Sequence, residues 1–247
     1  MIDRVAVTNL LKTIRERFTF DNPVLNRDCT EFEVNNWTIS RFVLHKLVPI
    51  VGVRPFPLNE QMLMVAALCR LQPTHIIEWG TNIGKSARIF YETCKTFGIS
   101  AEIHSIDLPD DVMHGEHPRE KRGLLVRGKE GVNLHLGDGL ETSQNILSQS
   151  RNATIRPLFF VDGDHSYASV KRELEGIISN APMANILLHD TFYQSAGSEY
   201  NIGPAQAIDD VLKSTPNDFN LLAQNTGLPG MTLLWRSGHT PGNYDHR

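Results

Sequence analysis

A short apolar run that ends in an acid and leads into a glycine turn limits what this chain can fold into more than any other stretch. Residues 75–79 read HIIEW, and Gly80 and Gly84 follow before a segment with helical spacing over residues 84–97. This is the order of a strand, a tight turn and a helix start. Glycines let the backbone turn sharply and approach a ligand closely, and a helix start offers unpaired N–H groups. The stretch therefore predicts a ligand site at the end of a strand.

Strands and helices alternate along the chain after this turn. Further strands are expected at residues 101–107, 132–136, 157–162 and 184–190. The helices are expected at residues 84–97, 140–149, 166–179 and 204–214. Two last strands are separated by a Gly-Leu-Pro-Gly turn that favours an antiparallel end, and they are expected at 219–224 and 231–235. The pattern predicts an α/β fold with a doubly wound, mostly parallel, Rossmann-like sheet and an antiparallel C-terminal strand.

Pro55 and Pro57 divide the chain, because proline is excluded from a helix interior. Helical spacing predicts helices over residues 1–18, 38–48 and 60–71, and Asn59 is expected to cap the last of them. Residues 108–131 are polar and irregular, and they predict a long insertion that contains a short helix. The expected division is a helical N-terminal extension (1–56), a main domain (57–236) and a C-terminal tail (237–247).

Composition argues against several kinds of partner. The chain has 247 residues, a net charge of −4 and no long basic tract, so a nucleic-acid partner is not expected. Residues 1–20 are charged and no apolar run is long enough to cross a bilayer, so neither a signal peptide nor a membrane span is expected. The three cysteines are an odd number without a C-x-x-C pair, which favours free thiols in a reducing compartment. We therefore expect a cytoplasmic protein with neither a nucleic-acid nor a membrane partner.

Every predicted strand from the glycine turn to the fifth strand ends in an acid or is followed by one. These acids are Glu78, Asp107, Asp138, Asp162 and Asp190. Ligands of doubly wound sheets bind outside the carboxyl ends of the strands, so the acids are expected to gather at one edge. Clustered carboxylates repel one another and lose hydration, a cost that stability does not explain. The placement therefore predicts a functional site at this edge.

Three interpretations of the glycine turn compete. A dinucleotide fingerprint, G-x-G-x-x-G, needs a glycine where Asn82 stands, so that the backbone can approach a pyrophosphate. A phosphate loop, G-x-x-x-x-G-K-[ST], is matched by GKS at residues 84–86, but its first glycine comes one residue late. The third pattern, E-x-G-x-x-x-G-x-S, spans residues 78–86, and Asp107 follows where an acid can accept hydrogen bonds from ribose hydroxyls.

The third pattern resembles the first motif of class I S-adenosylmethionine-dependent methyltransferases. The resemblance extends over residues 57–235 and rests on four stretches in order. They are residues 78–86 (EWGTNIGKS), 137–139 (GDG), 161–167 (VDGDHSY) and 187–191 (LLHDT). The set is similar to the catechol-type O-methyltransferases. It is closer to the methyltransferase domain 24 branch, with D-G-x-H-x-Y after the fourth strand, which includes sugar and macrolide O-methyltransferases and proteins labelled cephalosporin hydroxylase.

The resemblance implies where the methyl donor binds. Glu78 and Gly80 would line its methionine end, and Ser86 would hold its carboxylate. Asp107 would bind the ribose, while Asp138 and Gly139 would border the adenine. The full set of implied cofactor-binding residues is Glu78, Gly80, Asn82, Gly84, Ser86, Asp107, Asp138, Gly139 and Asp162.

The resemblance also implies how a methyl acceptor is activated. Asp162 and Asp190 match positions that bind a divalent cation, and two carboxylates at adjacent strand ends suit Mg²⁺. His165 matches the general base, and its near-neutral reference pKa suits that task. Catalysis would rest on His165 and Asp162, and the metal set would be Asp162, Asp190 and His189. His189 replaces the usual acid and is a softer ligand than Mg²⁺ prefers, so it would bind another metal, point away or mark a lost site.

These implications give a leading expectation and two alternatives. The leading expectation is an S-adenosylmethionine-dependent O-methyltransferase that acts on a small hydroxylated molecule, a sugar or a natural product, with Mg²⁺ or another divalent cation. The alternatives are a cofactor-binding protein without catalysis and a P-loop-type nucleotide-binding protein. The N-terminal helices and the insertion would cover the site or form a contact in a homo-oligomer.

Overall fold

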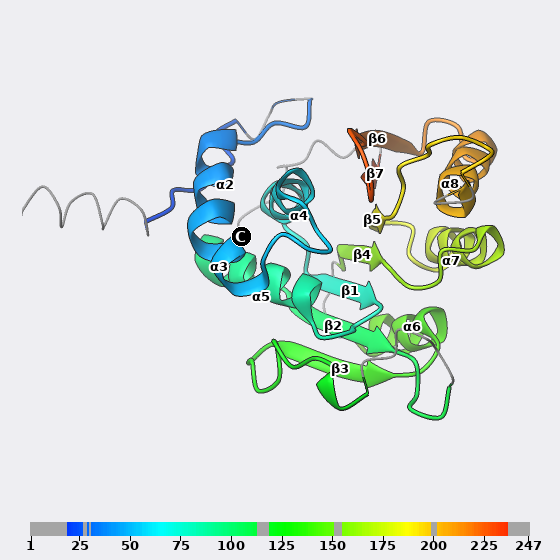
Figure 1. Cartoon of the computed structure of the whole chain (residues 1–247), viewed down its shortest axis with the longest axis horizontal. Helices are drawn as coiled ribbons and strands as arrows, with labels where there is room; N and C mark the ends of the chain where they lie inside the picture. The colour runs from blue at the N-terminus through cyan, green and yellow to red at the C-terminus, as the bar shows by residue number, and fades with distance from the viewer. Residues whose placement is uncertain are drawn as a thin grey trace, which may run out of the picture.

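The computed structural model describes residues 19–26, 29, 31–112, 119–150, 155–198 and 202–236. They form one sheet between two layers of helices (Figure 1). The helix predicted over residues 1–18 and the tail predicted over 237–247 lie outside the described residues.

The sheet has seven strands in the order β3-β2-β1-β4-β5-β7-β6. Their bounds are β1 His75–Trp79, β2 Glu102–Asp107, β3 Val132–Leu136, β4 Pro157–Val161, β5 Asn185–His189, β6 Phe219–Gln224 and β7 Met231–Arg236. Strands β1 to β5 pair in parallel, and β7 runs antiparallel to both β5 and β6. The predicted doubly wound, mostly parallel sheet with an antiparallel C-terminal end is therefore confirmed.

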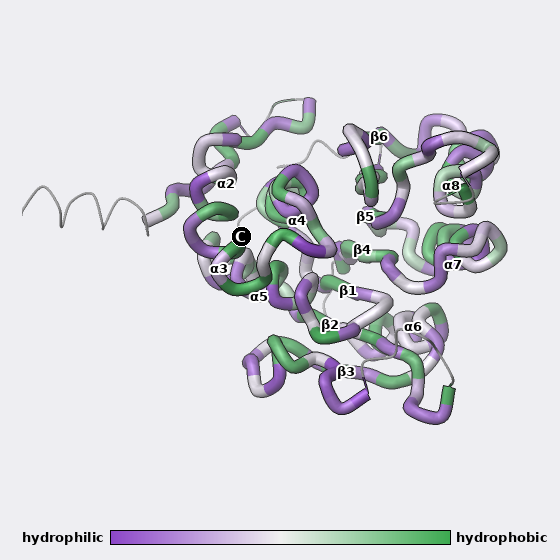
Figure 2. The backbone as a smooth tube through the Cα atoms, viewed as in Figure 1, coloured by the Kyte–Doolittle hydropathy of each residue, from purple (hydrophilic) through white to green (hydrophobic). Residues whose placement is uncertain are grey.

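Helices cover both faces of the sheet. On one face lie α2 (Asn36–Phe42), η1 (Val43–Leu47), α3 (Val48–Val51), α4 (Leu58–Leu71) and α5 (Lys85–Phe97), and on the other α6 (Gly139–Gln149), α7 (Tyr167–Asn180) and α8 (Ile202–Ser214) (Figure 1). Side chains of a central strand alternate between the two layers, so Phe160 of β4 joins the first core and Phe159 the second. All five residues of β4 are buried. In Figure 2 this strand is hydrophobic, as expected for a parallel strand covered on both faces.

The helical segment before α4 is longer than predicted, and α4 itself begins earlier than predicted. Helix α2, the π-helical turn η1 and α3 follow one another without a break over residues 36–51, where the sequence predicted 38–48. The Asn35 side chain caps α2 by accepting the N–H groups of Trp37 and Thr38. The predicted cap at Asn59 is wrong, because α4 already begins at Leu58 with Pro57 as its N-cap residue. Proline is accepted there because the first N–H groups of a helix lack helical partners in any case.

The segment before α4 packs on the main domain. Phe42 belongs to the same core as α4 and α5. Arg70 of α4 is almost fully buried, and its guanidinium donates to the carbonyl groups of Asn26 at 2.8 Å and Cys29 at 2.6 Å. Buried arginine that donates to backbone carbonyls fixes the path of the chain, because unpaired groups would cost free energy. The boundary at residues 56 and 57 stays a prediction.

Two further expectations concern the insertion and the cysteines. In the described part of the insertion, residues 119–121 form a short 3₁₀ helix, η2 (Arg119–Lys121). Cys29, Cys69 and Cys94 are free thiols, and the latter two are buried. Among the described helices, none is both long and apolar enough to cross a membrane.

Candidate active site

The glycine turn touches the loop after β4 through the backbone. Trp79 pairs in register with Val161, and the Asp162 N–H donates to the Trp79 carbonyl at 3.2 Å. Gly80 has a φ of +97°, and a Cβ at this position would lie 2.3 Å from the Asp162 carbonyl oxygen. Glycine alone combines this left-handed conformation with so close an approach. The backbone of the glycine turn is therefore in direct contact with the backbone of the loop after β4.

The insertion borders the same turn on its other side. The Gly123 N–H donates to the Asn82 carbonyl at 2.8 Å, and the Leu125 N–H donates to the Ile83 carbonyl at 3.0 Å. Asn82 itself adopts a left-handed φ of 44°. Gly84, at φ +85°, precedes α5, and a Cβ there would lie 3.0 Å from a methyl carbon of Val126. These contacts join the insertion to the glycine turn just before the start of α5.

Two of the predicted cofactor residues contact each other. Glu78 has no exposed surface, and its carboxylate accepts hydrogen bonds from the hydroxyls of Ser86 and Ser105, the latter at 2.5 Å. Burial raises the pKa of Glu78 to about 8, although the two serine hydroxyls oppose the shift. The Ser86 hydroxyl is thus directed into the turn rather than toward a ligand. In this structure the contact between Glu78 and Ser86 joins the end of β1 to the start of α5. The roles of the two residues as cofactor contacts stay predictions.

Asp107 ends β2 and accepts several donors. The N–H groups of Asn82 and Leu108 donate to its carboxylate at 3.2 and 2.8 Å. Arg122, which the sequence reasoning did not single out, lies 3.3 Å from the same carboxylate and 2.8 Å from that of Asp110. The acid predicted to bind ribose therefore also anchors the insertion. No local pattern in the polar insertion distinguishes Arg122 from its neighbours.

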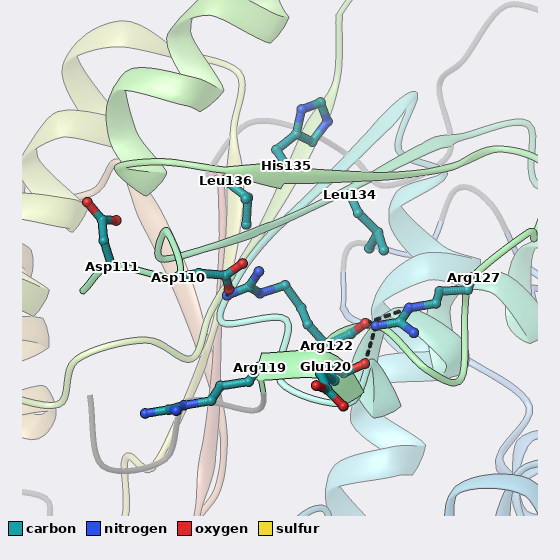
Figure 3. Close-up of a pocket in the computed structure, with 9 residues that line it drawn as sticks. All are labelled: Asp110, Asp111, Arg119, Glu120, Arg122, Arg127, Leu134, His135 and Leu136. Atoms are coloured by element: carbon teal, nitrogen blue, oxygen red, sulfur yellow. Dashed lines mark hydrogen bonds and ion pairs between the residues drawn. The ribbon is translucent and has the colours of Figure 1, made fainter. Parts of the chain in front are cut away.

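Arg122 also lines a cavity of about 770 Å³ beside β3. Its walls come from the loop after β2, the insertion and β3 (Figure 3). They are Asp110, Asp111, Arg119, Glu120, Arg122, Arg127, Leu134, His135 and Leu136. Figure 3 shows His135 on the opposite side of β3 from Leu134 and Leu136. The insertion thus encloses a space of mixed charge next to the Asp107–Arg122 pair.

Asp138 and Gly139 mark the end of β3 and the start of α6. Asp138 caps the helix by accepting the Glu141 N–H at 3.0 Å, and Arg172 lies 3.0 Å away. Hydrogen bonding from Arg172 holds the pKa of Asp138 below its ordinary value. A Cβ on Gly139 would lie 2.8 Å from the Trp79 ring, so glycine lets α6 pack against β1. Trp79 is buried at this contact.

Two carboxylates and two imidazoles gather at the ends of β4 and β5. His189 Nδ1 lies 2.9 Å from Asp162 Oδ1 and 3.2 Å from Asp190 Oδ2. His165 Nε2 lies 3.3 Å from Asp190 Oδ2 and 3.8 Å from Asp162 Oδ1. The His189 side chain is 3% exposed and that of His165 is 44% exposed, so of the two rings only that of His165 is accessible to a bound molecule. The four sequence-predicted residues of the acceptor site are therefore brought together.

Glu60 completes this cluster from α4, and the sequence reasoning missed it. Its Oε2 lies 3.1 Å from His189 Nε2, and its Oε1 accepts the Gly230 N–H at 2.8 Å. Glu60 is fully buried, and Phe56 packs its ring against that of His189 with centroids 4.8 Å apart. Glu60 lies in a stretch that reads as an apolar helix. The sequence offered one signal for Glu60, namely an acidic residue within a helix whose other positions are mostly apolar.

Charge balance in the cluster follows from these contacts. Burial opposes a charge on His189, but the carboxylates of Asp162, Asp190 and Glu60 raise its pKa well above the ordinary value. Burial likewise favours protonated acids, but His189 and His165 hold the pKa of Asp162 below its ordinary value, and the same imidazoles lower that of Asp190. The surrounding acids thus favour the protonated form of His189.

The donor set fits one divalent cation. One atom each of Asp162, His189 and Asp190 lies within 4.8 Å of the others. His189 does not point away, because its Nδ1 faces both aspartates while Nε2 is directed to Glu60. A metal-binding histidine commonly donates its second N–H to a carboxylate, which fixes the ring and its tautomer. Two carboxylates and an imidazole suit Mn²⁺, Co²⁺ or Zn²⁺ better than Mg²⁺.

The sheet order, with the glycine turn after β1, is that of the class I methyltransferase fold. Residues 77–191 match the model of a family described as a methyltransferase domain. Over these residues the chain is similar to this family, and the match supports a methyltransferase. The match favours the methyltransferase interpretation of the glycine turn over the phosphate-loop alternative.

Solved structures of low sequence identity share the fold. An SAH-bound methyltransferase from Podospora anserina is 15% identical, with a TM-score of 0.51, and the match covers 96% of this chain and 98% of that one. A TDP-rhamnose 3'-O-methyltransferase of calicheamicin biosynthesis is 17% identical, with a TM-score of 0.52, over 81% and 92%. The O-methyltransferase TomG from Streptomyces achromogenes, involved in tomaymycin synthesis and solved with SAM, is 16% identical, with a TM-score of 0.52, over 82% and 89%. No curated protein sequence matches the chain.

Replacing Glu78 by glutamine should change how stability depends on pH. The folded protein holds the Glu78 proton more tightly than the unfolded chain, because burial raises its pKa from 4.5 to about 8. Its stabilising contribution is therefore complete below pH 4.5 and declines as the pH rises toward about 8. Thermal unfolding should show the melting temperature of the wild type falling relative to that of Glu78→Gln across this window. Glu141→Gln, at an exposed glutamate, should leave the profile unchanged, and parallel profiles for wild type and Glu78→Gln would contradict the role of burial.

Proposed function

We propose that this protein is an S-adenosylmethionine-dependent O-methyltransferase that acts on a hydroxyl group of a small molecule, a sugar or a natural product. The observation that carries the proposal is the backbone contact between Gly80 and Asp162. It sets the predicted donor turn directly against the cluster of acids and imidazoles. Structures of the same fold that hold SAM or SAH, or that methylate a TDP-rhamnose, are consistent with this assignment.

The donor half of the site would use the turn and the next two strand ends. The bound cofactor supplies an electrophilic methyl group on a sulfonium. Gly80 lets the backbone come close to it, Asp107 receives the ribose hydroxyls, and Asp138 with Gly139 borders the adenine. Because Asp107 already accepts donors from Asn82 and Arg122, ribose would bind to a carboxylate whose position is fixed in advance. Preorganised contacts of this kind lower the entropic cost of binding.

The acceptor half would use His165 and the aspartates beside it. In methyl transfer the acceptor oxygen bonds to the methyl carbon while the carbon–sulfur bond breaks, and the hydroxyl proton passes to the imidazole ring of His165. Asp162 raises the pKa of His165, burial opposes this shift, and Asp190 adds to it, so the ring is a stronger base than a free histidine. The partly exposed ring can reach an acceptor, whereas the buried His189 cannot.

A divalent cation would be held by Asp162, Asp190 and His189, with Glu60 fixing the histidine from behind. Bound there, it would supply Lewis-acid polarisation of the acceptor hydroxyl. The cation would take the place of the proton on His189 Nδ1, and the second ring nitrogen would keep its contact with Glu60. We expect Mn²⁺, Co²⁺ or Zn²⁺ in preference to Mg²⁺, because one ligand is an imidazole.

The segment before α4 and the insertion would form the rim of the cleft. Phe56 lies on His189, and the Lys85 ammonium donates to the Arg54 carbonyl at 2.5 Å, so this segment is tied to the start of α5. On the other side, the insertion pairs with residues 82–83 of the turn. We extend the proposal to a covering role for the N-terminal extension (1–56) on the methyltransferase domain (57–236).

Cofactor binding can be tested at the glycine turn. Gly80→Ala should lower the affinity for SAM and SAH by more than about tenfold, since its Cβ would displace the loop at Asp162. Gly98→Ala is the matched control. Gly98 has a similar left-handed φ of +66° with open space around it, so the substitution adds backbone strain without a clash and should leave the affinity unchanged. Calorimetry that detects no binding of SAM or SAH to the wild type at millimolar concentration would reject the proposed function.

Acceptor activation can be tested at His165. With a panel of hydroxylated sugars and phenols as acceptors, His165→Gln should lower kcat by about a hundredfold or more while the affinity for SAH is retained. His45→Gln, at an exposed histidine on η1, serves as the control for loss of an imidazole. Undiminished methyl transfer by His165→Gln would mean that another group, or the cofactor alone, accounts for the reaction.

Metal binding can be tested at Glu60. In Co²⁺ titrations, the binding event that Asp162→Asn abolishes should weaken by about 10- to 100-fold in Glu60→Gln, because the histidine loses the carboxylate that orients it. Glu92→Gln removes another buried glutamate, one that pairs with Arg88 and Lys46, and should leave this event unchanged. Equal Co²⁺ affinity in Glu60→Gln and the wild type would show that Glu60 does not position His189 for a metal.

A further inference from the structure

A second group of metal-ligand side chains lies at the other end of the sheet, where β1 and β2 begin. His75 and Glu102 are the first residues of the two strands and pair in register. His104 is two residues further along β2, so it lies on the same face as Glu102. None of the three belongs to the methyltransferase site, which occupies the carboxyl ends of the strands.

The three side chains converge to the separation that one ion can bridge. One potential ligand atom from each of His75, Glu102 and His104 lies within 4.8 Å of the other two. The two imidazole rings are stacked, with centroids 6.0 Å apart and planes 12° from parallel. A carboxylate oxygen of Glu102 lies 3.5 Å from His104 Nε2. The group therefore offers two imidazole nitrogens and one carboxylate oxygen as ligands for a single ion.

The hydrogen-bonding pattern leaves a ring nitrogen directed at this point. Among the residues that the structure describes, no group makes a hydrogen bond to the buried Nε2 of His104. Its other nitrogen, Nδ1, lies 3.1 Å from Nε2 of His135 on β3. His75 uses Nδ1 for the hydroxyl of Thr74 at 2.9 Å, so its Nε2 is the nitrogen left to bind an ion. A buried nitrogen that makes no hydrogen bond and has a long, 3.5 Å contact to the Glu102 carboxylate is poorly satisfied, and a bound ion would satisfy it.

We propose that His75, Glu102 and His104 form a second metal site, selective for Zn²⁺ or a similar transition ion. His104 would bind through Nε2 and donate its Nδ1–H to His135, the arrangement in which a second imidazole fixes the ring of a ligand. Two imidazoles and a carboxylate leave a fourth position for water, and this donor set favours Zn²⁺ over Mg²⁺ or Ca²⁺. The ion would link the first residues of β1 and β2, at the opposite end of the strands from the candidate active site.

The electrostatics of the site are consistent with this use. Burial lowers the pKa of His104 to about 4, with His135 adding to the shift, and burial also lowers the pKa of His75. Burial thus disfavours the protonated form of both rings, which is the form that cannot bind a metal ion. Glu102 brings the negative charge that the two neutral ligands lack.

Calorimetry and thermal unfolding of the full chain with Zn²⁺ alone test the proposal. Glu102→Gln is the first variant, because its carboxylate is 62% exposed and the fold does not depend on it. His104→Gln is the second, and His45→Gln, at an exposed histidine elsewhere, is the control. We expect both site variants to lose one equivalent of tightly bound Zn²⁺ and the rise in melting temperature that it causes, while the control keeps both.

A further variant separates this ion from one at the active site. Asp162→Asn should keep the Zn²⁺ equivalent that His104→Gln removes, whatever the fate of the methyltransferase activity. The proposal is overturned if Glu102→Gln and His104→Gln bind as many Zn²⁺ ions, with the same affinity, as the wild type. It is equally overturned if Asp162→Asn alone removes all tightly bound Zn²⁺, since the ion would then belong to the active site.

Discussion

The buried imidazole of His189 must be surrounded by negative charge, and this requirement links the separate parts of the molecule. An uncompensated charge in the interior would cost several kcal/mol, so each acid around the ring has to be in place. Asp162 comes from the loop after β4, Asp190 follows β5, and Glu60 comes from α4. Glu60 in turn holds the N–H of Gly230 just before β7. Through these contacts the His189 ring and Glu60 connect α4 to the ends of β4 and β5 and to the start of β7.

A polar centre of this kind can exist because the rest of the sheet is so apolar. The central strands β1, β4 and β5 are buried along their whole length, and charge is concentrated where they end. The hydrophobic cores on the two faces are continuous and supply the stabilisation that the charged edge does not. The acids can then be arranged for chemistry, and the surrounding structure holds them at distances they would not adopt alone.

Local pattern was sufficient for most of the fold. The strand at residues 75–79 is bounded by Pro73 and Gly80, and the strand at 157–162 is an unbroken apolar run, so both were predicted to within a residue. The convergence of Asp162, His165, His189 and Asp190 followed from their places at adjacent strand ends. The partners of these residues could not be predicted in this way. Glu60 is 129 residues from His189 along the chain, and Arg122 lies in a loop without periodicity, so neither contact has a local signature.

The backbone contact between Gly80 and Asp162, here called the seam, also limits how the acceptor specificity of such an enzyme can change. Because two backbones meet there with no side chain between them, the seam cannot be widened by exchanging one residue for a smaller one. The proposed donor half and the proposed acceptor half of the site are therefore not structurally independent. A change of acceptor has to come from the loops that lead away from the seam, after β4 and after β5, where exposed side chains such as Tyr193 stand. New specificity would then arise in these loops while the contact between Gly80 and Asp162 stays constant.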